Sequence, residues 1–309
     1  MDKYLVVIAG PTASGKTATA IQVAKALGTE IISADSRQFY KELPIGTAAP
    51  TKEEQSEVQH HMIHNLNVED KYDVADYEND VLALLKKLFT NYDTVVLTGG
   101  SGLFIDAVCK GLDAIPDISE ETRNKVNKLY EEGGLFALQN EVQHLDPEYY
   151  NIVDKYNPRR LQRAVEVCYQ TGLTYSSFRN NTSKVRDFKI IKVALLWDRN
   201  ELISRINLRV EKMVSEGLLE EAKSMYPKRH LNSLNTVGYK ELFEHFDGKA
   251  TLNEAIEHIK INTRQYAKRQ MTWLRKNNDY QWFTIDEVPE MINYIKTVIS
   301  ENNNQQVLQ

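Results

Sequence analysis

An eight-residue segment near the N-terminus has the residue types and spacing of a phosphate-binding loop. It reads Gly-Pro-Thr-Ala-Ser-Gly-Lys-Thr and fits the pattern G-x-x-x-x-G-K-[ST] between a predicted strand and a predicted helix. The glycines let backbone N–H groups converge on phosphate oxygens, and the helix N-terminus adds positive potential. Lys16 is expected to neutralise phosphate charge, and the Thr17 hydroxyl to bind Mg²⁺. The predicted phosphate-binding residues are Gly10, Pro11, Thr12, Ala13, Ser14, Gly15, Lys16 and Thr17.

The residues that an ATPase adds to such a loop are incomplete. An ATPase normally has an apolar strand that ends in an acidic magnesium ligand. Here the apolar run from Thr94 to Thr98 ends in Gly99-Gly100 instead. Asp198 ends another apolar run, but a residue that caps the following helix would have the same position. This pattern is a first indication that the bound phosphates belong to a ligand other than ATP.

A carboxylate follows the second predicted strand, in the segment Ser-Ala-Asp-Ser-Arg-Gln. Ligands bind at the carboxyl edge of an open parallel sheet, so Asp35 is expected to face the phosphate loop and to accept a proton from a nucleophile. A lone aspartate at such a place usually caps a turn. Ser36, Arg37 and Gln38 add a hydroxyl, a bidentate cation and an amide suited to a base edge, which favours a functional role.

The apolar periodicity predicts an α/β fold: a P-loop NTPase-like core whose parallel sheet is flanked by helices, plus an all-helical insertion. Strands are predicted over Tyr4–Ala9, Glu30–Ala34, Thr94–Thr98 and Phe188–Trp197, and core helices over Lys16–Leu27, Val74–Phe89, Glu201–Gly217 and Leu252–Lys276. Between them no strand pattern is convincing, and helices are predicted over Ser119–Glu131, Leu135–Leu145 and Pro158–Gln170. The predicted domains are a first core part at 1–116, the insertion at 117–185 and a second core part at 186–309.

The composition constrains the compartment and the partners. Hydrophobic residues make up 42% of the chain and charged residues 26%, as in an ordinary globular protein, and no apolar run is long enough to span a bilayer. Cys109 and Cys168 have the spacing of neither a disulfide framework nor a metal site, so a cytoplasmic location is expected. The net charge of −5 argues mildly against non-specific nucleic-acid binding but allows a local basic surface. No membrane association and no obligate protein partner are expected.

Taken together, these segments resemble the bacterial-type tRNA dimethylallyltransferases, also called isopentenylpyrophosphate:tRNA transferases. The resemblance covers nearly the whole chain and rests on further blocks besides the two described above. These blocks are Gly-Thr-Ala at 46–48, His60-His61, Gly-Gly-Ser-Gly-Leu at 99–103, Pro-Arg-Arg-Leu-Gln-Arg-Ala-Val-Glu at 158–166, Val-Gly-Tyr-Lys-Glu at 237–241 and Thr-Arg-Gln-Tyr-Ala-Lys-Arg-Gln-Met-Thr-Trp-Leu-Arg at 263–275. The phosphate loop alone occurs in many proteins, whereas the combination is specific.

The resemblance implies a reaction and a set of catalytic residues. A dimethylallyl group would pass from dimethylallyl diphosphate to N6 of the adenosine 3′-adjacent to the anticodon of tRNA, with release of pyrophosphate and with Mg²⁺ as cofactor. It implies that the phosphate loop holds the pyrophosphate of the donor and that Asp35 is the general base. Thr17 and an arginine would contact the pyrophosphate. Arg205 and Arg209 lie four residues apart on one helical face, and of the two we favour Arg209.

The resemblance also implies that the helical insertion grips the anticodon stem-loop of tRNA. Arg159 and Arg163 share a helical face and are expected to hold phosphates of the stem. A later predicted helix carries cations interleaved with aromatic residues, a pattern that can track a phosphate backbone. The predicted tRNA-binding residues are Asp35, Ser36, Arg37, Gln38, Ser101, Arg123, Arg159, Gln162, Arg163, Ala164, Val165, Glu166, Arg264, Lys268 and Arg269.

Three other functions fit parts of this pattern. A small-molecule P-loop kinase shares the phosphate loop and an acid after the second strand, but it would turn over ATP. A prenyltransferase acting on free adenine nucleotides would not need the helical insertion. A non-catalytic RNA-binding module would use the loop only as an anion clamp, and the intact Asp35 and Thr17 count against it.

Overall fold

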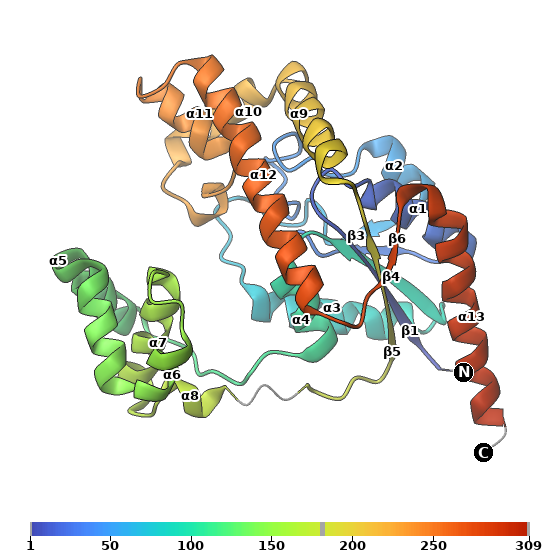
Figure 1. Ribbon diagram of the computed structural model, residues 1–309, viewed down its shortest axis with the longest axis horizontal. Coiled ribbons are helices and arrows are strands. Elements are labelled where there is room, and N and C mark those ends of the chain that lie inside the picture. Colours follow the sequence, from blue (N-terminus) through green and yellow to red (C-terminus); the bar gives the residue numbers. More distant parts are fainter. Residues whose placement is uncertain (1, 180–182, 308–309) are drawn as a thin grey trace. The chain divides into compact units, whose positions relative to one another are not determined.

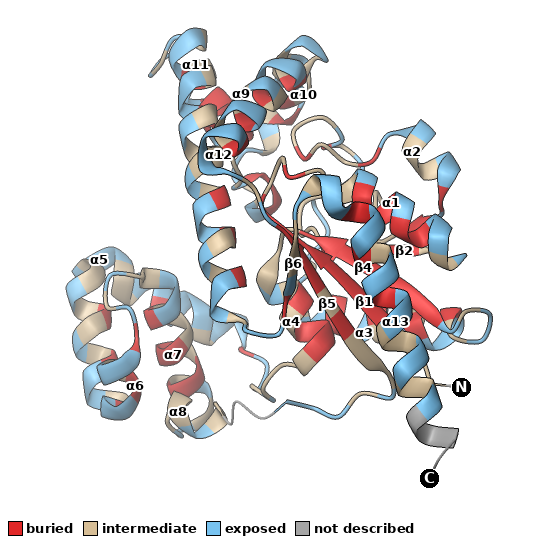
Figure 2. Cartoon of the chain, turned by 45° about the vertical axis from the view of Figure 1, so that its right-hand side comes forward, coloured by how far each residue is buried: buried red, intermediate tan, exposed pale blue. Residues whose placement is uncertain are grey.

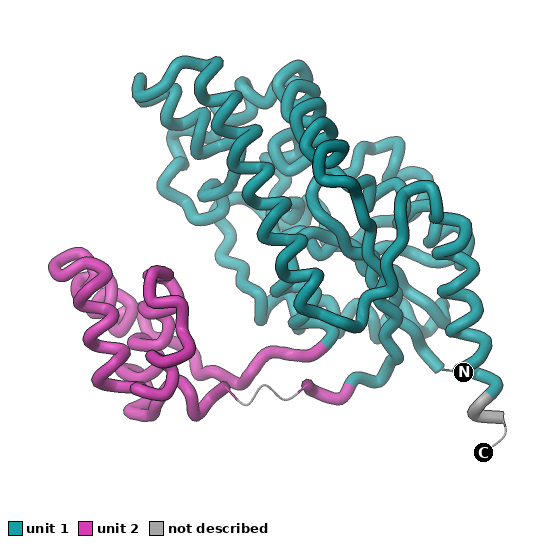
Figure 3. Tube along the Cα trace, viewed as in Figure 1, with its two compact units in different colours: residues 1–109, 186–309 teal, residues 110–185 magenta. Residues whose placement is uncertain are grey.

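The computed structural model describes residues 2–179 and 183–307, and the chain divides into two compact units (Figure 3). Residues 1–109 and 186–309 form the first, called the core unit below, and residues 110–185 form the second, the helical unit. The insertion predicted from the sequence spans 117–185. Each unit has a hydrophobic core of its own and is described by itself.

Among the described residues, six strands form one parallel sheet in the core unit (Figure 1). The strands are β1 (Tyr4–Ala9), β2 (Ile31–Ser33), β3 (His60–His61), β4 (Thr94–Gly99), β5 (Lys189–Leu195) and β6 (Gln281–Phe283). Their order is β3-β2-β4-β1-β5-β6, so β1 lies between β4 and β5. The predicted parallel sheet flanked by helices, with a P-loop NTPase-like fold, is confirmed.

Helices cover both faces of this sheet. The helices of the core unit are α1 (Lys16–Leu27), α2 (Lys52–Glu57), α3 (Val74–Leu88), α4 (Gly102–Lys110), α9 (Arg199–Ser215), α10 (Leu218–Met225), α11 (Tyr239–Phe246), α12 (Leu252–Lys276) and α13 (Val288–Val307), with 3₁₀ turns at Tyr226–Lys228, Asn232–Leu234 and Ile285–Glu287. No described helix combines the length and the apolar character that a membrane-spanning segment requires.

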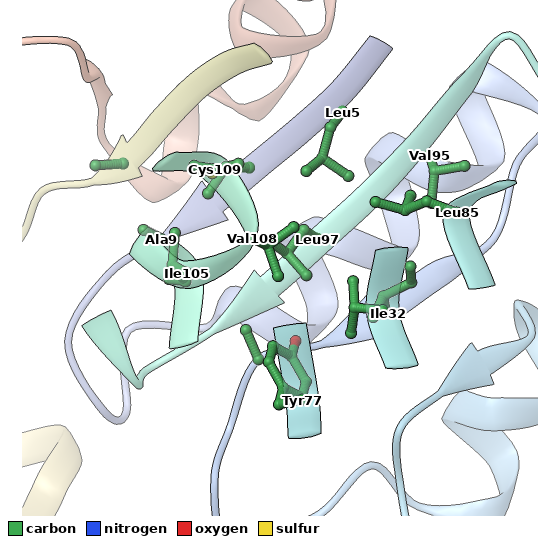
Figure 4. Close-up of a cluster of buried hydrophobic side chains, with 14 of the residues drawn as sticks. Leu5, Ala9, Ile32, Tyr77, Leu85, Val95, Leu97, Ile105, Val108 and Cys109 are labelled. Atoms are coloured by element: carbon green, nitrogen blue, oxygen red, sulfur yellow. The ribbon is translucent and has the colours of Figure 1, made fainter. Parts of the chain in front are cut away.

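The sheet is buried because alternate side chains of its strands point into two different cores. Leu5 and Val7 of β1 pack with α3 and α4, whereas Val6 and Ile8 pack with α1 and α13. The first of these cores is drawn in Figure 4, which labels Leu5, Ala9, Ile32, Tyr77, Leu85, Val95, Leu97, Ile105, Val108 and Cys109. Burial is concentrated in the strands and on the inward sides of these helices, as Figure 2 shows.

Helix α12 links this sheet to a separate helical layer of the core unit. It begins at a capping box in which the Thr251 hydroxyl and the Glu254 carboxylate cap each other's backbone. Its first half packs with α9, α10 and α11 through Ala255 and Ile259, and its last turn places Leu274 in the core next to α3 and α4. A single helix therefore spans the core unit from the helical layer to the sheet.

The helical unit contains α5 (Glu120–Leu145), α6 (Pro147–Ile152), α7 (Pro158–Thr171) and α8 (Tyr175–Phe178). The separation predicted between a helix that ends at Glu131 and one that begins at Leu135 is confirmed, because Gly134 has φ 62° and ψ −157° and interrupts α5. The buried Asp146 carboxylate joins two of the other helices. It accepts hydrogen bonds from the Tyr149 N–H at 2.9 Å and from the Ser176 N–H at 2.6 Å, so its burial is compensated.

Candidate active site at the carboxyl edge of the sheet

The phosphate loop connects β1 to α1 in a conformation that exposes backbone donors. Ala13 and Gly15 have φ values of 62° and 87°, in the left-handed region, so successive N–H groups can point to one side. No side chain caps the N-terminus of α1, which leaves its first amides for an anion. The Lys16 ammonium donates to the Pro11 carbonyl at 2.7 Å and thus folds back over the loop.

The outer side of the loop is held through its carbonyl groups. The Trp197 indole N–H donates to the Ser14 carbonyl at 2.9 Å, and Arg205 Nε donates to the Ala13 carbonyl at 2.8 Å. The Arg205 guanidinium also stacks over the Trp197 ring, 4.4 Å from its centroid. These contacts satisfy the carbonyls from outside the loop, so its amides remain available for a ligand.

The acid predicted to be the base lies in a turn directly after β2. Asp35 Oδ1 accepts the Arg37 N–H at 3.1 Å, so this carboxylate caps its turn as well as facing a cavity. The backbone N–H of Ser36, the residue after Asp35, donates to Ser101 Oγ at 3.0 Å. A side chain at Gly99 would not fit here, because its Cβ would lie 2.2 Å from the Ala34 carbonyl oxygen. The Gly-Gly-Ser-Gly segment after β4 therefore packs against the Asp35 turn and holds it in place.

Two adjoining cavities meet at Asp35. The first, of about 180 Å³, is lined by the phosphate loop from Thr12 to Thr17. The second, of about 390 Å³, is lined by Ser36, Arg37 and Arg269 among others. Four residues line both cavities: Thr12, Asp35, Arg209 and Tyr266. A ligand held by the loop and a second ligand in the larger cavity would therefore meet beside the Asp35 carboxylate.

The cations at this junction are poorly solvated. Burial lowers the pKa of the Lys16 ammonium to about 7, with a further contribution from the nearby Arg209 charge, while Asp35 opposes the shift. Burial also lowers the pKa of the Arg209 guanidinium, again against Asp35. The pKa of Tyr266 rises to about 12, chiefly through burial and then through the Asp35 charge. An anionic ligand in this cavity would stabilise the charged forms of both Lys16 and Arg209.

The structure places the two candidate arginines differently. Arg209 lines both cavities, and its Nη2 donates to the Thr47 carbonyl at 3.4 Å. Arg205 is exposed and lies on the outer side of the loop, bound to Ala13. Asp198, the other acid considered for a magnesium site, caps α9 by accepting from the Asn200 N–H at 2.7 Å.

A family model decides which group of proteins this arrangement belongs to. The model described as IPP transferase matches residues 38–277. The chain belongs to the IPP transferase family. That match includes Gln38, Ser101, Arg209 and Tyr266, but begins after the phosphate loop and Asp35.

Similar proteins cover the remaining parts of the chain. A protein named tRNA dimethylallyltransferase 1 from Phocaeicola vulgatus is 52% identical over 96% of this chain and 99% of its own length. A tRNA dimethylallyltransferase from Christiangramia forsetii is 49% identical over 97% of this chain and 100% of its own. The crystal structure of a full-length tRNA isopentenylpyrophosphate transferase from Bacillus halodurans is 34% identical, with a TM-score of 0.74 and 99% of each chain covered. A eukaryotic dimethylallyltransferase captured acting on tRNA has a TM-score of 0.79 at 23% identity, which supports the fold alone.

Several of the predicted tRNA-binding residues of the core unit form hydrogen bonds within that unit. Gln38 Oε1 accepts from the Ser33 hydroxyl at 3.0 Å, and Gln38 Nε2 donates to the Ala48 carbonyl at 3.2 Å. Arg37 Nη1 donates to the Ser233 carbonyl at 3.1 Å. Arg264 and Lys268 line a different groove, of about 560 Å³ between α9 and α12, whereas Arg269 lines the larger cavity beside Asp35.

In the helical unit, the predicted residues fall on different sides of α5 and α7. Arg123 and Arg159 are exposed. Gln162 Nε2 donates to the Asn127 side chain at 3.2 Å, and Arg163 pairs with Glu166 at 3.6 Å. The side chains of Ala164 and Val165 are only 1% and 0% exposed, in the core of the unit. Their burial leaves no side-chain surface for RNA, so the predicted contact at this block narrows to Gln162, Arg163 and Glu166.

Sequence reasoning missed one residue of the site, Gln270, and considered Tyr266 only as one of the aromatic residues interleaved with the cations. Both lie in the 263–275 block. Their signal is the spacing: Thr263, Tyr266 and Gln270 recur every three or four residues and therefore share one face of α12. All three line the cavities around Asp35.

We predict that Arg209 and Arg205 differ in their contribution to anion binding. Arg209→Ala should weaken the binding of inorganic pyrophosphate roughly 10- to 100-fold, because a charge-assisted hydrogen bond is lost inside the cavity. Arg205→Ala, the matched control four residues away, should change it less than about threefold. Isothermal titration calorimetry measures both, and a larger loss in Arg205→Ala would contradict the assignment.

We also predict a pH dependence that originates at Lys16. Since its pKa is lowered to about 7, the ammonium loses its proton as the pH rises above that value, and the attraction for an anion is lost with it. Pyrophosphate affinity should therefore fall by up to about tenfold per pH unit above neutrality, relative to Lys16→Arg, whose guanidinium stays charged. The protonation of pyrophosphate itself changes with pH in the same way in both experiments, so it cancels when the two proteins are compared. Parallel pH profiles would show that Lys16 stays protonated.

Proposed function

We propose that this chain transfers a dimethylallyl group from dimethylallyl diphosphate to N6 of the adenosine 3′-adjacent to the anticodon of tRNA, and releases pyrophosphate. The observation that carries the proposal is the junction of the two cavities. A cradle suited to a diphosphate and a second space adjoin each other, and Asp35 lies in the wall of both. Membership of the IPP transferase family and the names of close relatives support the same reaction. The kinase and the free-nucleotide alternatives have no comparable support.

The phosphate loop would meet the negative charge that develops on the leaving group. As the bond between the allylic carbon and the bridging oxygen breaks, the electron pair leaves with pyrophosphate. The first amides of α1, the Lys16 ammonium and the Arg209 guanidinium face the cavity where that charge forms. Donors that are already oriented towards a developing charge commonly provide the largest catalytic contribution. The double bond of the donor stabilises cationic character at the allylic carbon.

Asp35 would act as the general base for the acceptor. The exocyclic amine of adenine is a weak nucleophile because its lone pair is delocalised into the ring. While the new bond forms between N6 and the allylic carbon, the amine loses one proton, and the Asp35 carboxylate would accept it. Oδ1 accepts the Arg37 N–H at 3.1 Å, a contact that helps to orient the carboxylate.

The same cavity contains oxygen ligands suited to Mg²⁺. The Thr17 side chain lines it together with the carboxylates of Asp35 and Glu54. No group of three or more His, Cys, Asp or Glu side chains that could hold a metal occurs among the described residues. This matches a Mg²⁺ site completed by diphosphate oxygens and water, with Thr17 as the protein ligand. When bound, the ion would neutralise charge on the leaving group.

The acceptor would be a tRNA whose target base is unpaired. A base must be extruded to enter a cavity such as the one beside Asp35, and this is easiest in a single-stranded loop. Exposed cations of the helical unit, Arg159 foremost, would hold phosphates of the anticodon stem.

We predict that Asp35→Asn lowers the single-turnover rate of transfer at least about 100-fold, because the amide cannot accept the proton. Pyrophosphate binding should be retained, since removing a negative charge next to Lys16 and Arg209 does not weaken an anion site. Asp286→Asn, an exposed substitution in the same unit, is the matched control. A near-normal rate in Asp35→Asn would rule out the assignment of the base.

We further predict that Arg159→Ala combined with Arg163→Ala weakens tRNA binding. The slope of log affinity against log salt concentration should become shallower by the equivalent of about one to two phosphate contacts. The two cations would contact phosphates, so different tRNAs should be affected alike. Binding of dimethylallyl diphosphate should not change. Lys128→Ala, an exposed cation of α5, serves as the control. An unchanged tRNA affinity across a salt titration would assign these arginines to pairing within the helical unit, as Arg163 already pairs with Glu166.

A further inference from the structure

Gln270 connects the two loops that make the site. It lies on α12, is 7% exposed, and lines the cavity of the phosphate loop. Its Oε1 accepts the Thr12 N–H at 2.8 Å, and its Nε2 donates to the Gly100 carbonyl at 2.8 Å. A backbone N–H can only donate and a carbonyl can only accept, so the two partners determine the orientation of the amide.

The contact with Thr12 removes a donor from the phosphate loop. Pro11 has no N–H, the Thr12 N–H is bound to Gln270, and the Ser14 N–H is bound to the Pro11 carbonyl at 3.2 Å. Among the loop residues that line the cavity, the backbone donors that remain for a ligand are those of Ala13, Gly15, Lys16, Thr17 and Ala18. These lie at or next to the N-terminus of α1. A third phosphate placed on the Thr12 side of these donors would find no backbone N–H there, because that of Thr12 is already bound to Gln270.

The contact with Gly100 ties the same side chain to the Asp35 turn. A Cβ at Gly100 would lie 2.4 Å from Gln270 Nε2, so only glycine allows this approach. The next residue, Ser101, donates its N–H to the Ala34 carbonyl at 3.2 Å and accepts the Ser36 N–H at 3.0 Å. One amide side chain thus sets the spacing between the phosphate loop and the turn that carries Asp35.

We propose that Gln270 is a positioning residue that makes the cradle prefer a diphosphate to a triphosphate. It withholds the Thr12 amide from the ligand and holds the cradle at a defined separation from Asp35. The inference rests on the proposed function, because it explains how a phosphate loop of the NTPase type serves a diphosphate donor. Its central claim concerns binding, which can be measured without tRNA and without transfer.

The test compares inorganic pyrophosphate with tripolyphosphate, each in the presence of Mg²⁺, by isothermal titration calorimetry. The wild-type protein should bind pyrophosphate more tightly. In Gln270→Met, which has a similar shape but neither hydrogen bond, the ratio of the two dissociation constants should shift about tenfold towards tripolyphosphate. Gln270→Asn, too short to reach both partners, should shift it in the same direction. Gln270→Glu keeps an acceptor for the Thr12 N–H but loses the donor to the Gly100 carbonyl and adds a negative charge, so it should weaken the binding of both polyphosphates while it retains the preference.

Further measurements separate this role from a merely structural one. Gln22→Met, an exposed substitution on α1, is the matched control and should leave the ratio unchanged. The kcat of Gln270→Met should fall about tenfold while the KM for tRNA stays within about twofold. Variants that melt at lower temperature but keep the wild-type ratio would overturn the inference. Wild-type protein that binds neither polyphosphate would instead overturn the proposed function.

Discussion

β1 lies between β4 and β5 in a sheet whose strands all run in one direction, and the site depends on this pairing. Parallel strands end at the same edge, so the segments that follow β1, β2 and β4 must converge there. Those segments are the phosphate loop, the Asp35 turn and the Gly-Gly-Ser-Gly segment. Their separation in sequence, from Gly10 to Gly102, is therefore unrelated to their distance in space. The strand register sets that distance, and buried apolar side chains on both faces hold the register.

Helix α12 supplies the second constraint, because it contacts two of the three converging segments, the phosphate loop and the Gly-Gly-Ser-Gly segment. Gln270 binds the phosphate loop, and Trp273 packs so closely on Gly102 that an added Cβ would lie 2.4 Å from the indole. The Trp273 indole N–H also donates to the Asp106 carboxylate at 2.8 Å, which fastens the helix to α4. The glycines after β4 are thus explained by close packing, both against α12 and against Ala34.

The sequence predicted the elements with strong local patterns and missed those that depend on distant partners. β1, α1, α12 and the break at Gly134 follow from β-branched runs, helical periodicity and glycine. β3 and β6 span only two or three residues with polar members, and they exist because neighbouring strands pair with them.

The same distinction between local patterns and distant contacts holds in the site. The phosphate loop and Asp35 belong to short motifs that sequence reasoning recognised, whereas the roles of Tyr266 and Gln270 arise from contacts with segments more than 160 residues away. Likewise, spacing could not separate Arg205 from Arg209, since it does not reveal which side of the loop each guanidinium reaches.

Gln38 and Arg209 share an acceptor, the Thr47 carbonyl, which each contacts at 3.4 Å. A nucleobase that formed hydrogen bonds with the Gln38 amide would have to displace its present partners, and the Gly46–Ala48 segment would then lose one of the contacts that hold it. Arg209, held by that segment, would change its own position or freedom as a result. The free energy of occupying the proposed acceptor space would therefore be linked to that of occupying the phosphate cradle. Such linkage is reciprocal, so whichever substrate arrives first alters the affinity for the other by the same factor.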